Sequence, residues 1–357
     1  MKDRRRPSAT LAAAFAAALL AACGGGNEAD LEEAALPATT EPAGTAAPAE
    51  AGAPGGAVRV DPALPAYRPA GSLAGTLNSI GSDTLNNLMT LWAEAFRRHH
   101  PSVQTQIEGK GSSTAPPALI EGTAQLGPMS RAMKASEIDA FEREFGYPPT
   151  QVRVAIDALA VYVHRDNPLA RLTLPQVDAA FGKSRACGQP RPIDTWAAAG
   201  VGAPLAARPI SLYGRNSASG TYGFFKEKAL CGGDFRDTVK EQPGSASVVQ
   251  GVSEDPAGIG YSGIGYRTSG VKPLALAARD GTPFVGVDPK DVLAGRYPLS
   301  RFLYVYVNRA PGKPLPPLVA ETLRFVLSRE GQEVVVKDGY LPLPAGVAQE
   351  ELEKILQ

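Results

Sequence analysis

A stretch of glycine and small hydroxyl residues, Gly214–Gly223 (GRNSASGTYG), constrains the fold of this chain more than any other segment. The β-type run Ile210–Tyr213 precedes it, and the apolar, helix-compatible run Tyr222–Leu230 follows it directly. Within the stretch, Ser219 is suited to the N-cap of the following helix and Thr221 to an early helical position. The segment therefore predicts a strand, a tight turn and a helix in direct succession.

Two further segments repeat this arrangement. Gly81–Thr84 (GSDT) lies between the predicted strand Gly75–Ile80 and a helix with one apolar face, formed by Leu85, Leu88, Met89, Trp92, Ala95 and Phe96. Gly111–Thr114 follows the predicted strand Val103–Ile107 and opens a short helix with Pro116 near its first turn. Strands that alternate with helices indicate an α/β architecture, in which ligands bind beyond the carboxyl ends of the strands, where such turns lie.

The three turns offer the chemistry that an oxyanion requires. Backbone N–H groups at a helix start lack partners within the helix and lie at the positive end of its dipole. Glycine permits a ligand to approach closely, the hydroxyls add donors, and Arg131 and Arg215 lie beside such turns. One such turn is most simply an ordinary capped helix. Three turns with two arginines favour a bound oxyanion over purely structural caps.

The amino terminus has the pattern of an export signal. Basic residues precede the apolar run Leu11–Leu20, which is too short for a permanent membrane span. The following LAAC sequence resembles a bacterial lipobox, so residues 1–22 are predicted to be a lipoprotein signal peptide and Cys23 to carry lipid. A plain secretory signal with a chance cysteine is the alternative. Residues 23–70 are rich in Ala, Pro and Glu and predict a disordered tether.

Charge and cysteine content exclude or favour several classes of protein. The 357 residues carry 36 basic and 36 acidic side chains, so neither nucleic acid nor an anionic membrane surface is implied as a partner. The length suggests about two domains. Apart from Cys23 the chain contains only Cys187 and Cys231, and two thiols in an exported protein are more often bridged than free. We therefore predict a disulfide between Cys187 and Cys231.

Several segments resemble enzyme signatures only in part. Gly109–Ser113 ends like a P-loop, but Gln104 stands where the earlier glycine is required. Gly258–Gly263 fits a dinucleotide-binding pattern but leads towards Tyr266 rather than into a helix. A Ser-His-Asp arrangement would depend on His164 alone, and no Cys/His cluster has metal-binding spacing. The sequence therefore predicts no enzyme, no cofactor and no metal site.

The motifs together resemble one known family, the phosphate-binding proteins of bacterial high-affinity phosphate ABC transporters. The segments that carry the resemblance are GSDT, GKGSSTAPPALIEGTAQLGPMSR, GRNSASGT and SASVVQGVSEDPAGIGY, and the match runs from about Gly75 to about Leu343. The resemblance implies an α/β, two-lobed type 2 periplasmic-binding-protein fold with two crossover segments and a ligand cleft between the lobes. The crossovers are expected near Val154–Val161 and Gly263–Val271. Lobe I would then comprise residues 71–156 and 268–357, and lobe II residues 157–267.

The resemblance also implies a set of phosphate ligands. They are hydroxyl, glycine and charged residues of the loops described above: Ser82, Asp83, Thr84, Ser112, Ser130, Arg131, Arg215, Ser219, Gly220 and Thr221. The better-known branch of the family has a carboxylate where Arg131 stands and a hydroxyl residue where Asp83 stands. That branch also pairs its motif arginine with an acid two residues on, which is Ser217 in this chain.

Asp83 is expected to recognise the proton that phosphate keeps near neutral pH and that sulfate lacks, because an ionised carboxylate accepts hydrogen bonds and donates none. Arg131 and Arg215 would offset its charge and leave these three groups with a net charge of +1. The alternative is that Asp83 only caps the helix that begins at Thr84.

The implied function is high-affinity binding of inorganic phosphate outside the inner membrane and its delivery to the permease of a phosphate ABC transporter. The protein would be a monomeric lipoprotein, periplasmic or on the cell surface, and anchored through Cys23. The alternatives are a receptor for another oxyanion such as sulfate or molybdate, a secreted phosphatase, and a phosphate-sensing or adhesive surface protein without transport.

Overall fold

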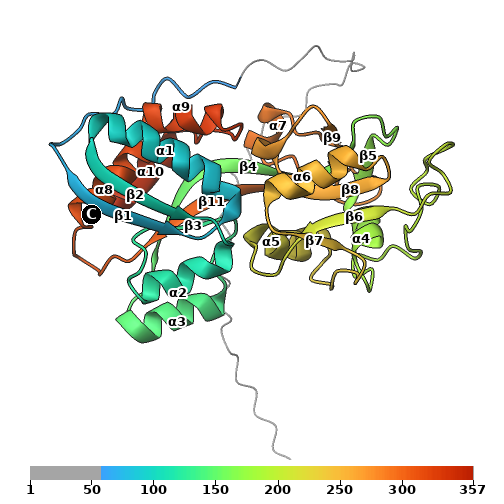
Figure 1. The fold of residues 1–357 in the computed structure, drawn as a ribbon, viewed down its shortest axis with the longest axis horizontal. Helices are drawn as coiled ribbons and strands as arrows, with labels where there is room; N and C mark the ends of the chain where they lie inside the picture. Colours follow the sequence, from blue (N-terminus) through green and yellow to red (C-terminus); the bar gives the residue numbers. More distant parts are fainter. Residues whose placement is uncertain (1–57, 357) are drawn as a thin grey trace, which may run out of the picture. The chain divides into compact units, whose positions relative to one another are not determined.

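The computed structural model describes residues 58–356, which lie within one compact unit of the chain (Figure 1). Its first elements are two parallel strands, β1 (Ala74–Ile80) and β2 (Ser102–Glu108), with Ala74 opposite Ser102. Helix α1 (Asn86–His99) joins the strands and packs against β2. The succession of strand, turn and helix predicted for this part of the sequence is confirmed.

Helix α1 forms because its apolar residues recur at helical spacing. Its buried face consists of Leu88, Met89, Trp92, Ala95 and Phe96, and most of the remaining positions are polar. Basic residues occupy its last turn, where they interact favourably with the helix dipole. The apolar face predicted from the sequence is therefore the face that packs into the core.

A seven-stranded sheet contains most of the other strands, in the order β3-β11-β4-β8-β6-β7, with β9 also paired to β4. Its strands are β3 (Gly127–Met129), β4 (Thr150–His164), β6 (Ser211–Arg215), β7 (Lys240–Gln242), β8 (Gly258–Gly263), β9 (Val271–Pro273) and β11 (Ser300–Val307). β11 pairs antiparallel with β3 and β4, whereas β6 pairs parallel with β7 and β8. Strands β5 (Arg171–Thr173) and β10 (Ala275–Ala277) form a separate parallel pair.

Strand β4 joins the side of this sheet that contains β3 and β11 to the side that contains β8, β6 and β7 (Figure 1). Its residues 150–158 pair with β11, and its residues 159–163 pair with β8. Every residue from Val154 to Val163 is buried, and Asp157 is the only charged residue among them. A strand that is covered on both faces is typically a continuous apolar run, and β4 has this character over Val154–Val163.

Helices cover the sheets and complete the described chain. The α-helices beyond α1 are α2 (Ala115–Ile120), α3 (Ala135–Phe145), α4 (Leu174–Phe181), α5 (Gly220–Ala229), α6 (Ser245–Glu254), α7 (Pro289–Leu293), α8 (Pro317–Val326), α9 (Arg329–Lys337) and α10 (Ala345–Leu356). The short 3₁₀ helices are η1 (Asp83–Leu85), η2 (Ser112–Thr114) and η3 (Ile264–Tyr266). Within residues 58–356, no helix combines the length and the apolar character needed to span a membrane.

The folded part of the chain begins earlier than predicted. The predicted tether includes residues 58–70, yet Leu64 and Tyr67 are buried in the main core. The Arg329 N–H, at the start of α9, donates to the Pro65 carbonyl at 2.8 Å and holds the segment in place. Composition alone missed this anchor because a single leucine and a single tyrosine provide it. The predicted signal peptide (1–22), the lipid on Cys23 and the tether up to residue 57 lie outside the described residues.

The predicted disulfide between Cys187 and Cys231 is confirmed, with a Cα–Cα distance of 5.4 Å. It ties residues 182–210, a segment without helix or strand, to the end of α5. The two cysteines are 44 residues apart in sequence, and closing a loop of that length stabilises the folded state by about 4 kcal/mol at most in the chain-entropy model.

The anchoring Tyr67 belongs to a buried polar cluster. Its hydroxyl donates to Glu321 Oε1 at 2.8 Å and lies 2.7 Å from His100 Nε2. Because the hydroxyl has one hydrogen, His100 Nε2 is the donor in this pair, and the neutral ring leaves Nδ1 without a hydrogen. Nδ1 is buried and has no hydrogen-bond partner among the described residues. Protonation would add an unpaired N–H to the interior, and burial lowers the pKa of His100.

We expect His100 to make the protein less stable on mild acidification. In the unfolded chain His100 binds a proton below about pH 6.5, whereas the folded protein resists protonation to a lower pH. The contribution of neutral His100 to the free energy of unfolding is complete above about pH 6.5 and is lost as the pH falls through the lowered pKa of His100. Urea unfolding between about pH 7 and pH 5 measures the loss, and His100→Gln should flatten it. His164→Gln is the control; an unchanged pH dependence in His100→Gln would contradict the assignment.

Candidate functional site

The three glycine and hydroxyl turns meet at one place in the structure. Each follows the carboxyl end of a strand, β1, β2 or β6. Thr84 Oγ1 lies 2.9 Å from Thr221 Oγ1, and Ser130 Oγ lies 3.3 Å from Ser112 Oγ and 3.4 Å from Thr221 Oγ1. All four side chains are buried. Segments up to 137 residues apart in sequence thus form one polar cluster.

Two glycines permit this close approach. A Cβ at Gly220, the first residue of α5, would lie 2.2 Å from Ser112 Oγ. Gly111 has a φ of +124°, and a Cβ there would lie 2.5 Å from the Ala218 carbonyl oxygen. The Ser113 N–H donates to the same carbonyl at 3.1 Å. Side chains at either glycine would force these turns apart, so glycine is required at both positions.

Three hydroxyl oxygens of the site each accept a hydrogen bond from an N–H donor. The pairs are Ser112 Oγ with the Ser130 N–H (3.0 Å), Ser219 Oγ with the Tyr222 N–H (3.3 Å), and Thr221 Oγ1 with Arg301 Nη2 (3.0 Å). The Ser219 contact is the predicted N-cap of α5. An oxygen that accepts such a bond keeps its own hydrogen to donate elsewhere. The three hydroxyls are therefore arranged as donors, which suits an anionic ligand.

Arg215, at the end of β6, is a buried cation of the site. The residue is 2% exposed, its Nη1 donates to Ser245 Oγ at 2.7 Å, and Nη1 lies 3.2 Å from Asp83 Oδ2. Its Nε has no hydrogen-bond partner among the described residues. Burial lowers the pKa of Arg215, and the neighbouring Asp83 opposes this shift. A buried guanidinium with an unmatched N–H strongly favours an anionic acceptor.

The Asp83 carboxylate reaches across to another helix. Ser82 occupies the N-cap of η1, and no side-chain cap bond forms there. Asp83 Oδ2 accepts a bond from the Ser245 N–H, the first of α6, at 2.8 Å and also faces Arg215. The alternative in which Asp83 only caps the helix after Thr84 is therefore wrong.

Three hydrogen bonds to or from its backbone fix the first turn, residues 82–84. They run from the Ser82 N–H to the Pro128 carbonyl (2.8 Å), from the Tyr266 hydroxyl to the Asp83 carbonyl (2.9 Å), and from the Tyr340 hydroxyl to the Thr84 carbonyl (2.8 Å). Burial raises the pKa of both tyrosine hydroxyls, so both remain donors. The sequence did not single out either tyrosine, since each lies far from the turn along the chain.

Arg131 is paired with an acid that the sequence did not single out. Its Nη1 and Nη2 donate to both carboxylate oxygens of Glu137, at 2.7 and 2.6 Å, and Nη2 also reaches Ser113 Oγ at 3.2 Å. Arg131 therefore lies beside the second turn, but its charge is compensated. The net charge of +1 expected for Arg131, Arg215 and Asp83 falls to zero once Glu137 is included.

A second buried ion pair, Arg301 with Asp157, lies at the site and was not predicted. Arg301 Nη1 donates to the Ser130 carbonyl at 2.8 Å, and Nη2 donates to Thr221 Oγ1 at 3.0 Å. Its Nε and Nη2 both donate to Asp157 Oδ2, at 3.0 and 2.8 Å. The sequence offered one signal for this pair, a single acid in the apolar strand β4 and a single arginine in the apolar strand β11. A charge buried in such a strand requires a partner of opposite charge.

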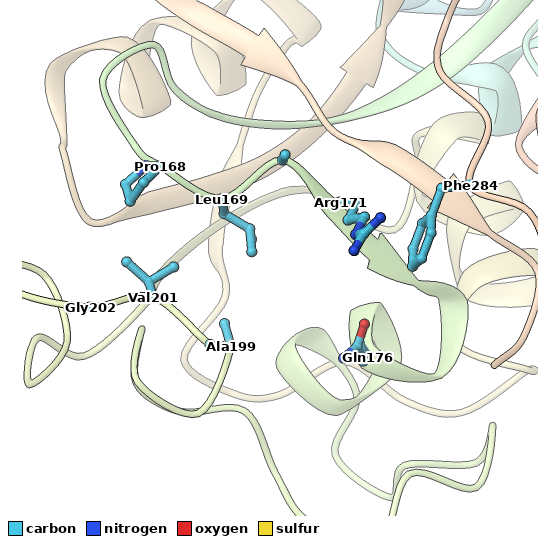
Figure 2. Close-up of a pocket in the computed structure, with 10 residues that line it drawn as sticks. Pro168, Leu169, Arg171, Gln176, Ala199, Val201, Gly202 and Phe284 are labelled. Atoms are coloured by element: carbon cyan, nitrogen blue, oxygen red, sulfur yellow. The ribbon is translucent and has the colours of Figure 1, made fainter. Parts of the chain in front are cut away.

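A surface cavity of about 420 Å³ lies apart from this site. Its lining includes Pro168, Leu169, Arg171, Gln176, Val201 and Phe284, and Figure 2 shows the Arg171 guanidinium beside the Phe284 ring. The two groups are 4.8 Å apart, and the lining shares no residue with the polar turns. Across residues 58–356, no group of three or more His, Cys, Asp or Glu side chains is arranged to hold a metal ion.

Known proteins resemble this chain over most of its length. A family model described as a PBP superfamily domain matches residues 67–330. The phosphate-binding protein PstS of Pseudomonas aeruginosa is 58% identical over 304 residues, which cover 85% of this chain and 94% of that relative. This chain belongs to the PstS phosphate-binding protein family. The family resemblance found in the sequence is confirmed.

Solved structures that are similar to this chain extend the comparison. A candidate phosphate ABC transporter substrate-binding protein from Clostridium perfringens, crystallised with phosphate, is 25% identical with a TM-score of 0.62, covering 76% of this chain and 100% of that one. A candidate phosphate-binding protein from Planctomyces limnophilus is 26% identical with a TM-score of 0.57, covering 80% and 100%. The predicted α/β, type 2 periplasmic-binding-protein fold is confirmed.

Proposed function

We propose that this chain binds inorganic phosphate outside the inner membrane and delivers it to the permease of a phosphate ABC transporter. The observation that carries the proposal is the buried Arg215, whose Nε lacks a partner among the described residues, beside hydroxyls arranged as donors. The printed names of the PstS relatives support phosphate as the anion. Those names describe binding proteins, so we propose that the chain catalyses no reaction. We also propose that it is a monomer.

We propose that the site lies between the two lobes that the family resemblance implies. We propose residues 71–156 and 268–357 for the first lobe and 157–267 for the second. The change of pairing within β4 supports a crossover near Val154–Val161, and the other crossover would lie near Gly263–Val271. Phosphate would bind between the turns of the first lobe and the start of α5 in the second. Hinge closure would bring these groups together around it.

The proposed ligands are of three kinds. Donors from hydroxyl and backbone groups are Ser82, Thr84, Ser112, Ser130, Ser219, Gly220 and Thr221. Arg215 donates through a charged fork, and Asp83 accepts the hydrogen bond from the phosphate proton. Arg131 stays in the proposed set, with its charge offset by Glu137. Because the nearby charges cancel, oriented donors rather than a net positive charge would hold the anion.

Titration calorimetry of the purified protein with phosphate, sulfate and molybdate tests the proposal. We expect phosphate to bind most tightly. Tighter binding of sulfate or molybdate would favour the receptor for another oxyanion, and binding of none would refute an oxyanion receptor. Release of phosphate from a phosphomonoester would instead support the secreted phosphatase.

We expect Arg215→Ala to lose most of the phosphate affinity. The variant removes a buried, charge-assisted donor, and such contacts are commonly worth about 1.5–3 kcal/mol. Arg208→Ala is the control, because Arg208 is an exposed arginine of the proposed second lobe. Calorimetry should show the loss only in the first variant. A change below about threefold in Arg215→Ala would assign this residue a purely structural role.

We expect Asp83→Asn to weaken phosphate binding and to admit sulfate. The asparagine keeps the size of the side chain but loses the negatively charged acceptor for the phosphate proton. Sites built to bond a ligand hydroxyl reject analogues that lack one, as sulfate does, by about 10⁴-fold in favourable cases. Both affinities are measured in wild type and variant at one pH and salt concentration. An unchanged phosphate-to-sulfate ratio, with stability reduced by about 0.5–2 kcal/mol, would show that Asp83 only anchors the start of α6.

We further propose that Cys23 is the first residue of the mature protein and carries lipid, which would make the protein a periplasmic or cell-surface lipoprotein. The lipobox-like LAAC sequence supports this proposal. Two or three acyl chains hold a protein stably at a membrane, whereas one does not. We expect Cys23→Ala to leave the detergent phase in phase partitioning. Full retention of the variant in that phase would argue against the anchor.

A further inference from the structure

We propose that Arg301 is a further residue of the binding site, which orients the Thr221 hydroxyl and links the closed cleft to its hinge. The proposal rests on the phosphate site described above. Arg301 is 4% exposed, and all three of its side-chain nitrogens donate. They reach the Ser130 carbonyl, Asp157 Oδ2 and Thr221 Oγ1, all within 3.0 Å. One guanidinium therefore contacts β4, the residue after β3 and the first turn of α5.

Asp157 holds Arg301 at the point where β4 changes its partner. Residues of β4 up to 158 pair with β11, and those from 159 pair with β8. Asp157 Oδ1 accepts a bond from the Ile264 N–H at 3.0 Å, directly after β8, while Oδ2 accepts from Arg301. This buried carboxylate thus connects both proposed crossover segments to a single guanidinium.

The contact with Arg301 fixes the direction of the Thr221 hydroxyl. A guanidinium stays protonated and only donates, so Thr221 Oγ1 must accept from it whenever the two touch. The Thr221 hydrogen then has to point to another acceptor. Thr84 and Ser130, which lie 2.9 and 3.4 Å away, are hydroxyls that can donate as well as accept. A phosphate oxygen without a proton only accepts, and it is therefore the acceptor that this arrangement matches best.

The contact between Arg301 and Thr221 would stabilise only the closed state of the cleft. Arg301 and Ser130 belong to the proposed first lobe and Thr221 to the second, so opening would separate Thr221 from Arg301. The pair of Arg301 with Asp157 involves β11 and β4 and would survive opening. An interaction present only in the closed state slows its opening. Loss of this contact should therefore speed phosphate release more than it slows phosphate capture.

The test compares three variants of the full chain by calorimetry, by rapid-mixing release of labelled phosphate and by urea unfolding. Arg301→Lys keeps the charge beside Asp157, but an ammonium group lacks the fork that reaches all three partners. Asp157→Asn removes the negative charge and leaves one acceptor oxygen for two donors, Arg301 and the Ile264 N–H, so the hold on Arg301 is weakened. Arg153→Lys is the matched control. Like Asp157, Arg153 lies on β4, and like Arg301 it pairs with a buried carboxylate, that of Glu351, which lies outside the site.

We expect Arg301→Lys and Asp157→Asn to weaken phosphate binding by about tenfold or more, chiefly through faster release. Arg153→Lys should lose comparable stability while its phosphate affinity stays within about twofold of wild type. Unchanged release rates in Arg301→Lys and Asp157→Asn, with only unfolding affected, would overturn this proposal and leave the phosphate site standing. If Arg301→Lys does not fold, Asp157→Asn decides by the same criterion. A wild-type protein that binds no phosphate would instead refute the proposed function, and the role of Arg301 with it.

Discussion

Burial of two guanidinium groups, those of Arg215 and Arg301, is the constraint on which this site depends. A buried charge is costly unless it is paired, and each arginine meets a carboxylate from a distant part of the sequence, Asp83 or Asp157. These pairs form only when β4, β6, β11 and the turn after β1 take their observed positions. The match of charges therefore couples the sheets to the polar turns, and the donor hydroxyls are positioned as a consequence.

Much of the site could be predicted because its signals are local. GSDT and GRNSASGT each specify a turn and a helix start within a few residues, and Ser219 caps α5 as expected. Other partners could not be identified from the sequence. Arg301 and Asp157 are 144 residues apart, and neither strand indicates which charge the other provides. Glu137 follows Arg131 closely, but nothing in the sequence around it indicates that its side chain turns back from α3 to the arginine.

The fold was hardest to predict where burial outweighs local preference. Helix α9 contains Gly331 in its first turn and three consecutive valines, a combination that disfavours a helix. It forms nonetheless, because Ser328 caps it through the Gly331 N–H and two of the valines are buried against the core. The segment 58–70 follows the same logic, since Tyr67 and Leu64 anchor residues whose composition indicates disorder.

The pairing of charges at the site also determines how an anion would arrive there. The three pairs are Arg131 with Glu137, Arg215 with Asp83, and Arg301 with Asp157. Their fields largely cancel at a distance, and salt screens what remains beyond about 8 Å at physiological ionic strength. Encounter would then depend on diffusion and on dipoles that act at short range rather than on electrostatic steering. A receptor of this kind would collect its ligand at nearly the same rate in dilute and in saline surroundings.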